Sequence, residues 1–206
     1  MRIILTSSNS RLTQESKELL LDLEGIFPSA EPVPRRGRHF KTFVEEETGG
    51  EEALIIRMDQ IDVSHRRLLF IRKDKQGDLT TSTFSIVSFV LCRNLSGAVD
   101  TGHMPEITLA DFDETENDQR IVRDIEDIFR IEAPDFAGRQ VVSFTKKRGF
   151  IMCRKHRYII RLPEEETGKE KVRFDEIGPR IAIKLQSVDV NENYIFRHGK
   201  NIKIKD

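Results

Sequence analysis

The sequence predicts an α/β (α+β) fold made of two similar half-domains. Short apolar strands alternate with amphipathic helices along the 206 residues. The two clearest helical segments end alike, in LDLEGIF at 21–27 and RDIEDIF at 123–129, and each is followed, after a proline-containing linker, by Gly-Arg. A repeated unit of this kind predicts an internal duplication. Chance convergence of two amphipathic helices is the alternative.

The first half, residues 1–95, begins with a short strand at 3–5. A polar turn at 6–11 follows, whose side chains are expected to cap a helix or whose backbone N–H groups could hold a phosphate. Leucines at helical spacing predict that helix, and Pro28 ends it. Runs rich in β-branched and aromatic residues predict three further strands, at 53–58, 67–72 and 83–91.

The second half, residues 104–206, repeats this order. A strand at 107–109 leads through an acidic capping turn into an amphipathic helix that ends near Phe129. Later β-rich runs predict strands at 140–144, 150–162 and 180–188, and the charged segment 164–171 predicts a loop. Together the halves predict one domain that spans residues 1–206.

Composition limits the class of protein. With 37% hydrophobic and 33% charged residues, the chain can bury a core. The opening apolar run is too short for a signal peptide, and no later run approaches a membrane span, so we expect neither secretion nor a membrane partner. The two cysteines, Cys92 and Cys153, predict no disulfide framework and fit a reducing compartment.

Charge is strongly segregated along the chain, although the net charge is only -1. Eleven acidic residues stand against three arginines between Glu106 and Asp135. Eight Lys or Arg and no acid lie between Arg139 and Arg161, and shorter basic runs occupy 34–41 and the tail 197–205. Such runs indicate a positive surface for phosphates, or else solvated faces that balance the acidic helix.

Catalytic chemistry has little support in the sequence. The phosphate-binding, dinucleotide-binding, serine-hydrolase and zinc-protease motifs are all absent. Five histidines and two cysteines are scattered without the spacing of a zinc site. We therefore expect no enzyme activity, no catalytic residue, no metal, no cofactor and no small-molecule substrate.

Nucleic-acid binding has better support. Cations and a histidine interrupt the predicted strand FIMCRKHRYIIR beside Tyr158, where guanidinium groups can pair with phosphate and rings can stack on unpaired bases. In PRRGRH, Gly37 permits a tight turn from which the arginines are expected to project. Proline restricts the backbone at Gly178-Pro179. The strand that follows is expected to alternate buried isoleucines with cations that face solvent. The candidate RNA-binding residues are Arg35, Arg36, Arg38, His39, Lys146, Lys147, Arg148, Arg154, His156, Arg157, Arg180 and Lys184.

The same segments carry a family resemblance. In order, they are S-x-R-L at 8–12, Ile-Phe-Pro at 26–28, Arg-Gly-Arg-His at 36–39, GRQVVSFTKKRGFIMCRKHRYI at 138–159, and Glu-Ile-Gly-Pro-Arg at 176–180. This order resembles the Brix-domain family of ribosome assembly factors. The resemblance implies two α/β halves like the anticodon-binding domain of class II synthetases, a role in pre-rRNA processing, and a place in the nucleus and nucleolus.

Two branches of the family are similar to this chain. The first segments resemble the small-subunit member of the U3 snoRNP, and this is the expected assignment, with pre-rRNA, U3 snoRNA and other assembly proteins as partners. The runs GRQVVSF and RKHRYI resemble at least as well the large-subunit ribosome production factor, which is the alternative. A third hypothesis, from another class, is a protein scaffold whose acidic helix at 117–130 docks a basic partner.

Overall fold

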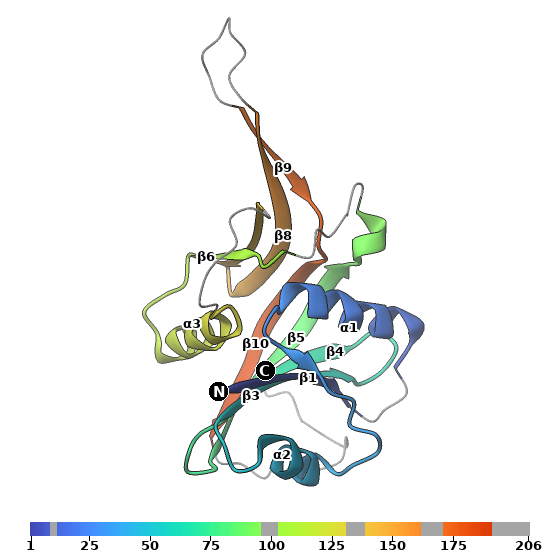
Figure 1. Cartoon of the computed structure of the whole chain (residues 1–206), viewed down its shortest axis with the longest axis vertical. Helices are drawn as coiled ribbons and strands as arrows, with labels where there is room; N and C mark the ends of the chain where they lie inside the picture. Colours follow the sequence, from blue (N-terminus) through green and yellow to red (C-terminus); the bar gives the residue numbers. More distant parts are fainter. Residues whose placement is uncertain (9–11, 96–102, 131–138, 162–170, 191–206) are drawn as a thin grey trace, which may run out of the picture.

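The computed structural model describes residues 1–8, 12–95, 103–130, 139–161 and 171–190 (Figure 1). Within these ranges it shows three α-helices and a ten-stranded sheet, in the order β2-β1-β3-β4-β5-β10-β8-β7-β6, with β9 paired to β8. The helices are α1 (Gln14–Ile26), α2 (Phe40–Thr48) and α3 (Glu116–Ile128). The strands are β1 (Arg2–Ser7), β2 (Glu31–Pro32), β3 (Ala53–Gln60), β4 (Arg66–Lys73), β5 (Leu79–Val90), β6 (Glu106–Ala110), β7 (Gln140–Lys147), β8 (Phe150–Arg161), β9 (Lys171–Glu176) and β10 (Arg180–Val190).

The strand topology has the same sequence in each half. β1 runs parallel to β3, which is followed by antiparallel β4 and β5. β6 runs parallel to β7, which is followed by antiparallel β8, and β10 then pairs with β8. The two half-sheets join where β5 and β10 pair antiparallel, so a single sheet runs through the molecule. A mixed α/β architecture is therefore confirmed.

Helices α1 and α3 also begin alike. Each follows a threonine in extended conformation whose hydroxyl accepts a hydrogen bond from the backbone N–H three residues later: Thr13 from Ser16 at 3.3 Å and Thr115 from Asp118 at 3.2 Å. A cap of this kind contributes about 1 kcal/mol to helix stability. The cap of α1 is thus Thr13, later than the sequence predicted; Asn9 and Ser10 lie outside the described residues.

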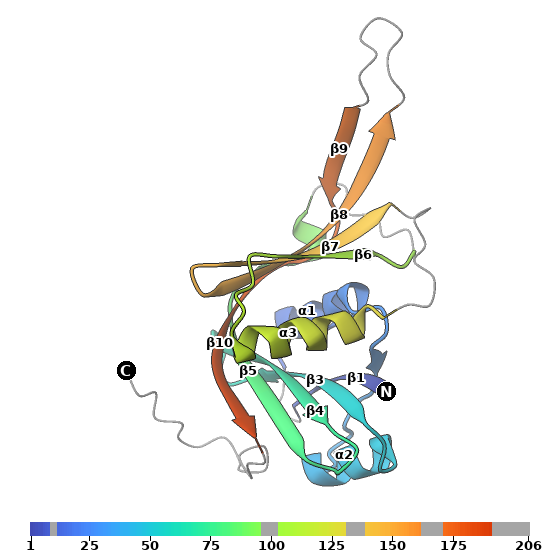
Figure 2. The same cartoon turned by 90° about the vertical axis from the view of Figure 1, so that its left-hand side faces the viewer.

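The main core lies where the sheet bends around α1 and α3 (Figure 2). We call the face of the sheet against these helices the inner face, and the opposite face the outer face. The inner face brings together side chains of both halves, such as Leu23 of α1, Ile125 of α3, Phe70 of β4 and Ile181 of β10, all buried. Because one apolar cluster includes both helices and both half-sheets, the halves share one core.

Polar contacts also tie the two halves together. Arg72 of β4 donates hydrogen bonds to Asp124 at 2.7 Å and Asp127 at 2.6 Å, both on α3. Burial raises the pKa of Asp124, although Arg72 opposes that shift. Lys155 of β8 donates to the carbonyl of Gly25 at the end of α1, at 3.0 Å. Since a buried carboxylate without a cation is costly, Arg72 is a structural residue.

Helix α2 was not predicted, and it changes the outer face of the first half. Phe40, Phe43 and Val44, at helical spacing, pack on Ile55 and Leu69 of the sheet in a second, smaller core. Gly49 ends the helix in the left-handed conformation, with φ 55°, as glycine does most readily. The outer face of the first half is therefore covered by a helix.

Strand β9 was also not predicted, and it explains the Gly-Pro motif. The N–H groups of Ile177 and Gly178 donate to the carbonyl of Lys155, at 3.0 and 3.2 Å. A Cβ placed on Gly178 would lie 2.3 Å from the Cβ of Lys155. Glycine is therefore required by the close approach of two strands, and not by a positive φ.

Candidate nucleic-acid interface

The outer face of the second half carries the densest group of predicted site residues. Along β8 and β10, alternate side chains face opposite sides of the sheet. Cys153 and Ile181 are buried in the inner core, so their neighbours Arg154, Arg180 and Lys184 are on the outer face. No helix of the described residues packs there in the way that α2 packs on the first half. In the described part of the chain, this surface is therefore left without a covering helix.

Strand register aligns cations across the outer face. Lys147 of β7 is opposite Phe150 of β8, which is opposite Lys184 of β10. The register continues through Ser85 of β5 to Arg67 of β4, which belongs to the first half and lies 3.6 Å from the carboxylate of Asp59. The ammonium of Lys184 lies 5.7 Å from the centre of the Phe150 ring. The cations in this row lie on every second strand, about 10 Å apart at the spacing of neighbouring strands, and can contact phosphates along a nucleic-acid backbone.

A second group surrounds His156. The guanidinium of Arg180 donates two hydrogen bonds to Glu176, at 3.0 and 2.5 Å, which lowers the pKa of that carboxyl. Arg180 is nevertheless 45% exposed, so it is paired with an acid without being buried. Burial, with Arg154 and Arg180 nearby, lowers the pKa of His156 against the opposing effect of Glu176. The lowered pKa favours the neutral ring in this cationic neighbourhood.

The predicted cluster 154–157 is divided by the strand itself. Arg154 and His156 are on the outer face, whereas Lys155 and Arg157 are on the inner side of β8. Lys155 is buried and holds the end of α1, as described above. Arg157 is opposite Asp175 of β9. Neighbouring residues in a strand cannot face one surface, so only half of this run serves the outer face.

The PRRGRH turn is more ordered than predicted. Arg35 and Arg38 fold back: each donates to a main-chain carbonyl of the other, and Arg38 also donates to Glu46 and Glu47 at 2.9 and 2.8 Å. Their guanidinium groups lie over Phe40 and Phe43. Burial and the nearby Arg57 lower the pKa of Arg35. The expectation that all three arginines project outward is wrong, because α2 supplies partners for two of them.

Arg36, by contrast, is exposed. Arg36 has a φ of 51° and Gly37 a φ of 79°, so both residues adopt the left-handed conformation. The backbone turns at these two residues, and Arg36 is exposed there. His39 is exposed and precedes α2 without a side-chain cap hydrogen bond. The first half therefore offers Arg36 and His39 as accessible candidates.

Lys146 serves the fold. Its ammonium is 2.5 Å from Asp113 and 2.6 Å from Asp118, at the start of α3, and these hydrogen bonds raise the pKa of Lys146. Of the acids that the scaffold hypothesis requires on α3, Asp118, Asp124 and Asp127 are engaged within the chain by Lys146 and Arg72. Lys147 and Arg148 remain exposed at the β7–β8 hairpin, where Arg148 has a φ of 52°.

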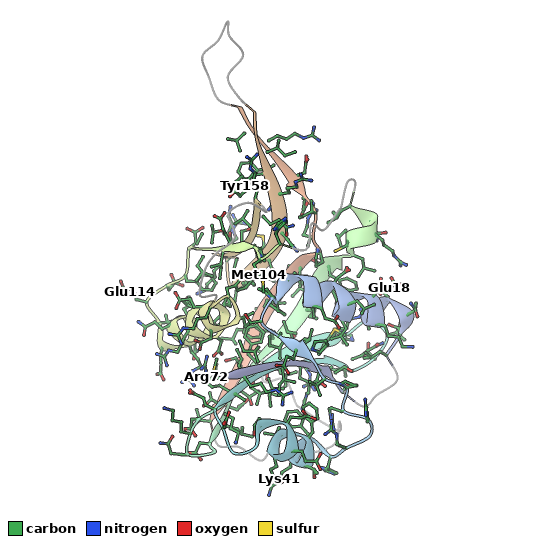
Figure 3. The ribbon with its side chains drawn as sticks, viewed as in Figure 1. Glu18, Lys41, Arg72, Met104, Glu114 and Tyr158 are labelled. Carbon is green, nitrogen blue, oxygen red and sulfur yellow. The ribbon has the colours of Figure 1, made fainter. Side chains whose placement is uncertain are left out.

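Sequence reasoning missed an exposed aromatic residue, Phe174 of β9, which is opposite Tyr158 of β8. Figure 3 shows Tyr158 on the ribbon that β8 and β9 extend beyond the helices. Phe174 is 63% exposed, and its alternation with charged neighbours in KVRFDE was a signal for a strand. The alternation could not show that the apolar side of this strand would face solvent.

The described residues form neither a metal site nor a membrane-spanning helix, and their cysteines are free. In the described ranges, no group of three or more His, Cys, Asp or Glu is placed to hold a metal ion. None of the helices described is long and apolar enough to span a membrane. Cys92 and Cys153 are both free, and burial raises the pKa of the Cys153 thiol, which makes it a poor nucleophile.

A family model and several known proteins match this chain. The family model described as the Brix domain matches residues 9–187. A Brix domain-containing protein of Schizosaccharomyces pombe is 24% identical over 188 residues, which cover 90% of this chain and 60% of that protein. Ribosome production factor 1 of Xenopus laevis is 27% identical over 197 residues, which cover 90% of this chain and 51% of that protein.

Shorter matches are more similar. Ribosome production factor 1 of Saccharomyces cerevisiae is 33% identical over 107 residues, 52% of this chain and 34% of that protein. Among solved structures, a probable ribosomal biogenesis protein from Aeropyrum pernix aligns over 89% of this chain and 95% of its own, at 11% identity and a TM-score of 0.49. The chain spans 50 to 60% of the length of the relatives that match 90% of it.

Proposed function

Because the chain belongs to the Brix domain family, we propose that it is a ribosome biogenesis factor that binds pre-rRNA through the outer face of its second half-sheet. The proposed role is non-catalytic and takes place in the nucleolus, together with other assembly proteins. The observation that carries the proposal is the group of cations Lys147, Arg154, Arg180 and Lys184 on the outer face of the second half, which no described helix covers.

The charge of the outer face favours an anionic partner, which we propose to be RNA. The strands place Lys147, Arg154, Arg180 and Lys184 on the outer face of the second half, against Glu176 and Glu106. Regularly spaced cations on an open sheet release counterions from a nucleic acid and hold its backbone. Arg36 and Arg148, both exposed, are proposed as peripheral contacts, whereas Lys146, Lys155, Arg35 and Arg38 are assigned to structure.

The relatives' names favour the large-subunit branch. Several relatives are called ribosome production factor 1, and the sequence resembles the large-subunit production factor in GRQVVSF and RKHRYI. We therefore propose a large-subunit precursor as the site of action, in place of the small-subunit U3 particle that the first segments suggested. U3 snoRNA is accordingly not among the proposed partners.

We also propose that residues 1–206 form one domain in which 1–95 and 104–206 arose by duplication. The repeated strand order and the two threonine-capped helices support this proposal. The likeness to the synthetase anticodon-binding domain stays a prediction.

RNA binding is tested with matched charge reversals. The variant K147E/R154E/K184E should lose most affinity for rRNA fragments, and the slope of log affinity against log salt should fall by about 2, since each phosphate contact contributes about 0.7 to 0.9. The control K17E/K75E/R123E changes the net charge equally at exposed sites on α1, the β4–β5 turn and α3. Equal losses for the two variants, or salt-independent binding, would contradict an RNA site on the outer face.

The subunit is tested separately. The tagged protein is sedimented from its own cells and the crosslinked RNA is sequenced. Migration with the large-subunit precursor is expected. Migration with the small-subunit precursor and U3 would overturn the assignment to the large subunit and leave the RNA site unaffected.

A further inference from the structure

Three aromatic rings meet on the outer side of the β8–β9 ribbon. The register sets His156 opposite Glu176 and Tyr158 opposite Phe174, so the three rings are on one side of the ribbon. The ring centres of His156 and Phe174 are 6.4 Å apart at an interplanar angle of 88°, and those of Tyr158 and Phe174 are 6.4 Å apart at 50°. Phe174 is thus held between two other rings.

The group is oriented by polar contacts. The hydroxyl of Tyr158 donates to Glu106 of β6 at 2.5 Å, which anchors that ring to the sheet. Glu176, opposite His156, is itself held by Arg180. Rings that are held before a ligand arrives lose little conformational entropy when it binds.

Despite these contacts, the group faces solvent. Phe174 is 63% exposed and its outer-side neighbour Val172 is 51% exposed, because the ribbon projects beyond α1 and α3 (Figure 1). Large exposed aromatic side chains of this kind mark a binding surface. Cations border it: Arg154 is on the same face, and Arg157 is on the other side of β8.

We propose that His156, Tyr158 and Phe174 form a stacking platform for the unpaired bases of single-stranded RNA. The inference rests on the proposed RNA-binding function and adds its substrate class. Bases in a paired helix present no free face, whereas unpaired bases stack on aromatic rings while neighbouring cations contact their phosphates. The nearby arginines match the phosphates of RNA, and their desolvation disfavours a purely apolar protein partner.

The first test compares substitutions at Phe174 on two RNAs. Affinity is measured by fluorescence anisotropy, at one salt concentration, for a 12-nucleotide single strand and a blunt duplex of the same length. F174A and F174L should each weaken single-strand binding by roughly 5- to 100-fold, the range that a lost stacking contact predicts. Duplex binding should change less than about twofold, because only phosphates are contacted.

A further variant, F174Y, compared with F174L, separates stacking from other roles. F174Y keeps the ring and should bind as the wild type does, whereas F174L keeps apolar volume without a π-face. Wild-type affinity in F174L, or equal losses on both RNAs, would overturn the platform. So would unchanged RNA binding with loss of assembly into the precursor, which would indicate a protein partner.

A spectroscopic test does not depend on affinity. The chain has no tryptophan, so F174W introduces a single reporter. Its fluorescence should be quenched by the single strand and not by the duplex. V63W, at an exposed residue of the β3–β4 turn, should be quenched by neither. Absence of quenching in F174W with intact binding would remove the platform, whereas failure of the wild type to bind any RNA would remove the proposed function itself.

Discussion

The two half-sheets share their inner face but differ on the outer one. In the first half, α2 covers the outer face with Phe43 and Phe40, and its acids hold Arg38. In the second half, no described helix occupies the equivalent place, and cations and aromatic rings are left there. The same strand order can therefore present two different outer surfaces, because helix α2 is present in the first half and has no counterpart among the described residues of the second.

Weakening the packing of α2 on the sheet should have the largest effect on stability. Phe43 is fully buried between α2 and the sheet, so F43A should lower the free energy of unfolding by about 3–5 kcal/mol through lost burial and a cavity. The counterpart F150A, on the outer face of the second half, should lower it by no more than about 1–2 kcal/mol. Urea unfolding measures both; equal losses would erase the difference between the two faces.

The polar link between the two halves can be removed at Arg72, which joins β4 to α3. R72M leaves Asp124 buried without its cation, and should lower the free energy of unfolding by about 2–4 kcal/mol. R93M, which removes an exposed pair with Glu18, should cost less than about 1 kcal/mol. R72M/D124N should regain part of the loss. A negligible cost for R72M would show that the halves do not depend on this link.

The second half has its own anchor at Gly178, where we expect a smaller effect. G178A forces a Cβ against that of Lys155 and should lower the free energy of unfolding by about 1–3 kcal/mol. K155G removes the opposing Cβ, so G178A/K155G should lose less than the sum of the single variants, whereas K155A, which keeps the Cβ, should give no relief. Simple additivity with K155G would contradict the close approach as the reason for glycine.

The smallest effect on stability concerns the protonation of His156 on the outer face of the second half. Burial, Arg154 and Arg180 lower the pKa of His156, so its NMR titration midpoint should lie below the unfolded value of about 6.5. R154Q should raise that midpoint, and E176Q should lower it further. Because the pKa of His156 is lower in the folded than in the unfolded state, protonation of this ring favours unfolding. The contribution of His156 to the free energy of unfolding is therefore fully present above pH 6.5 and declines as the pH falls below it. A midpoint above 6.5 would mean that Glu176 dominates this surface.

Part of the candidate site could be predicted from local sequence. The alternation at 180–184 correctly indicated that Ile181 and Ile183 are buried and that Arg180 and Lys184 are exposed, since a strand alternates its faces. The partners of Lys146 and Arg38 could not be predicted, because their acids are on α3 and on the unpredicted α2. Whether a cation is available therefore depends on contacts remote from its own segment.

By itself, the sequence determined the alternation of strands and two amphipathic helices, because periodicity is a local property of the chain. It also determined where cations accumulate. Only the tertiary structure decided which of them face one surface, and that the apolar side of β9, with Phe174, is exposed. The alternation of KVRFDE indicates a buried side, but burial requires a second layer, and the ribbon extends beyond the helices that would provide it.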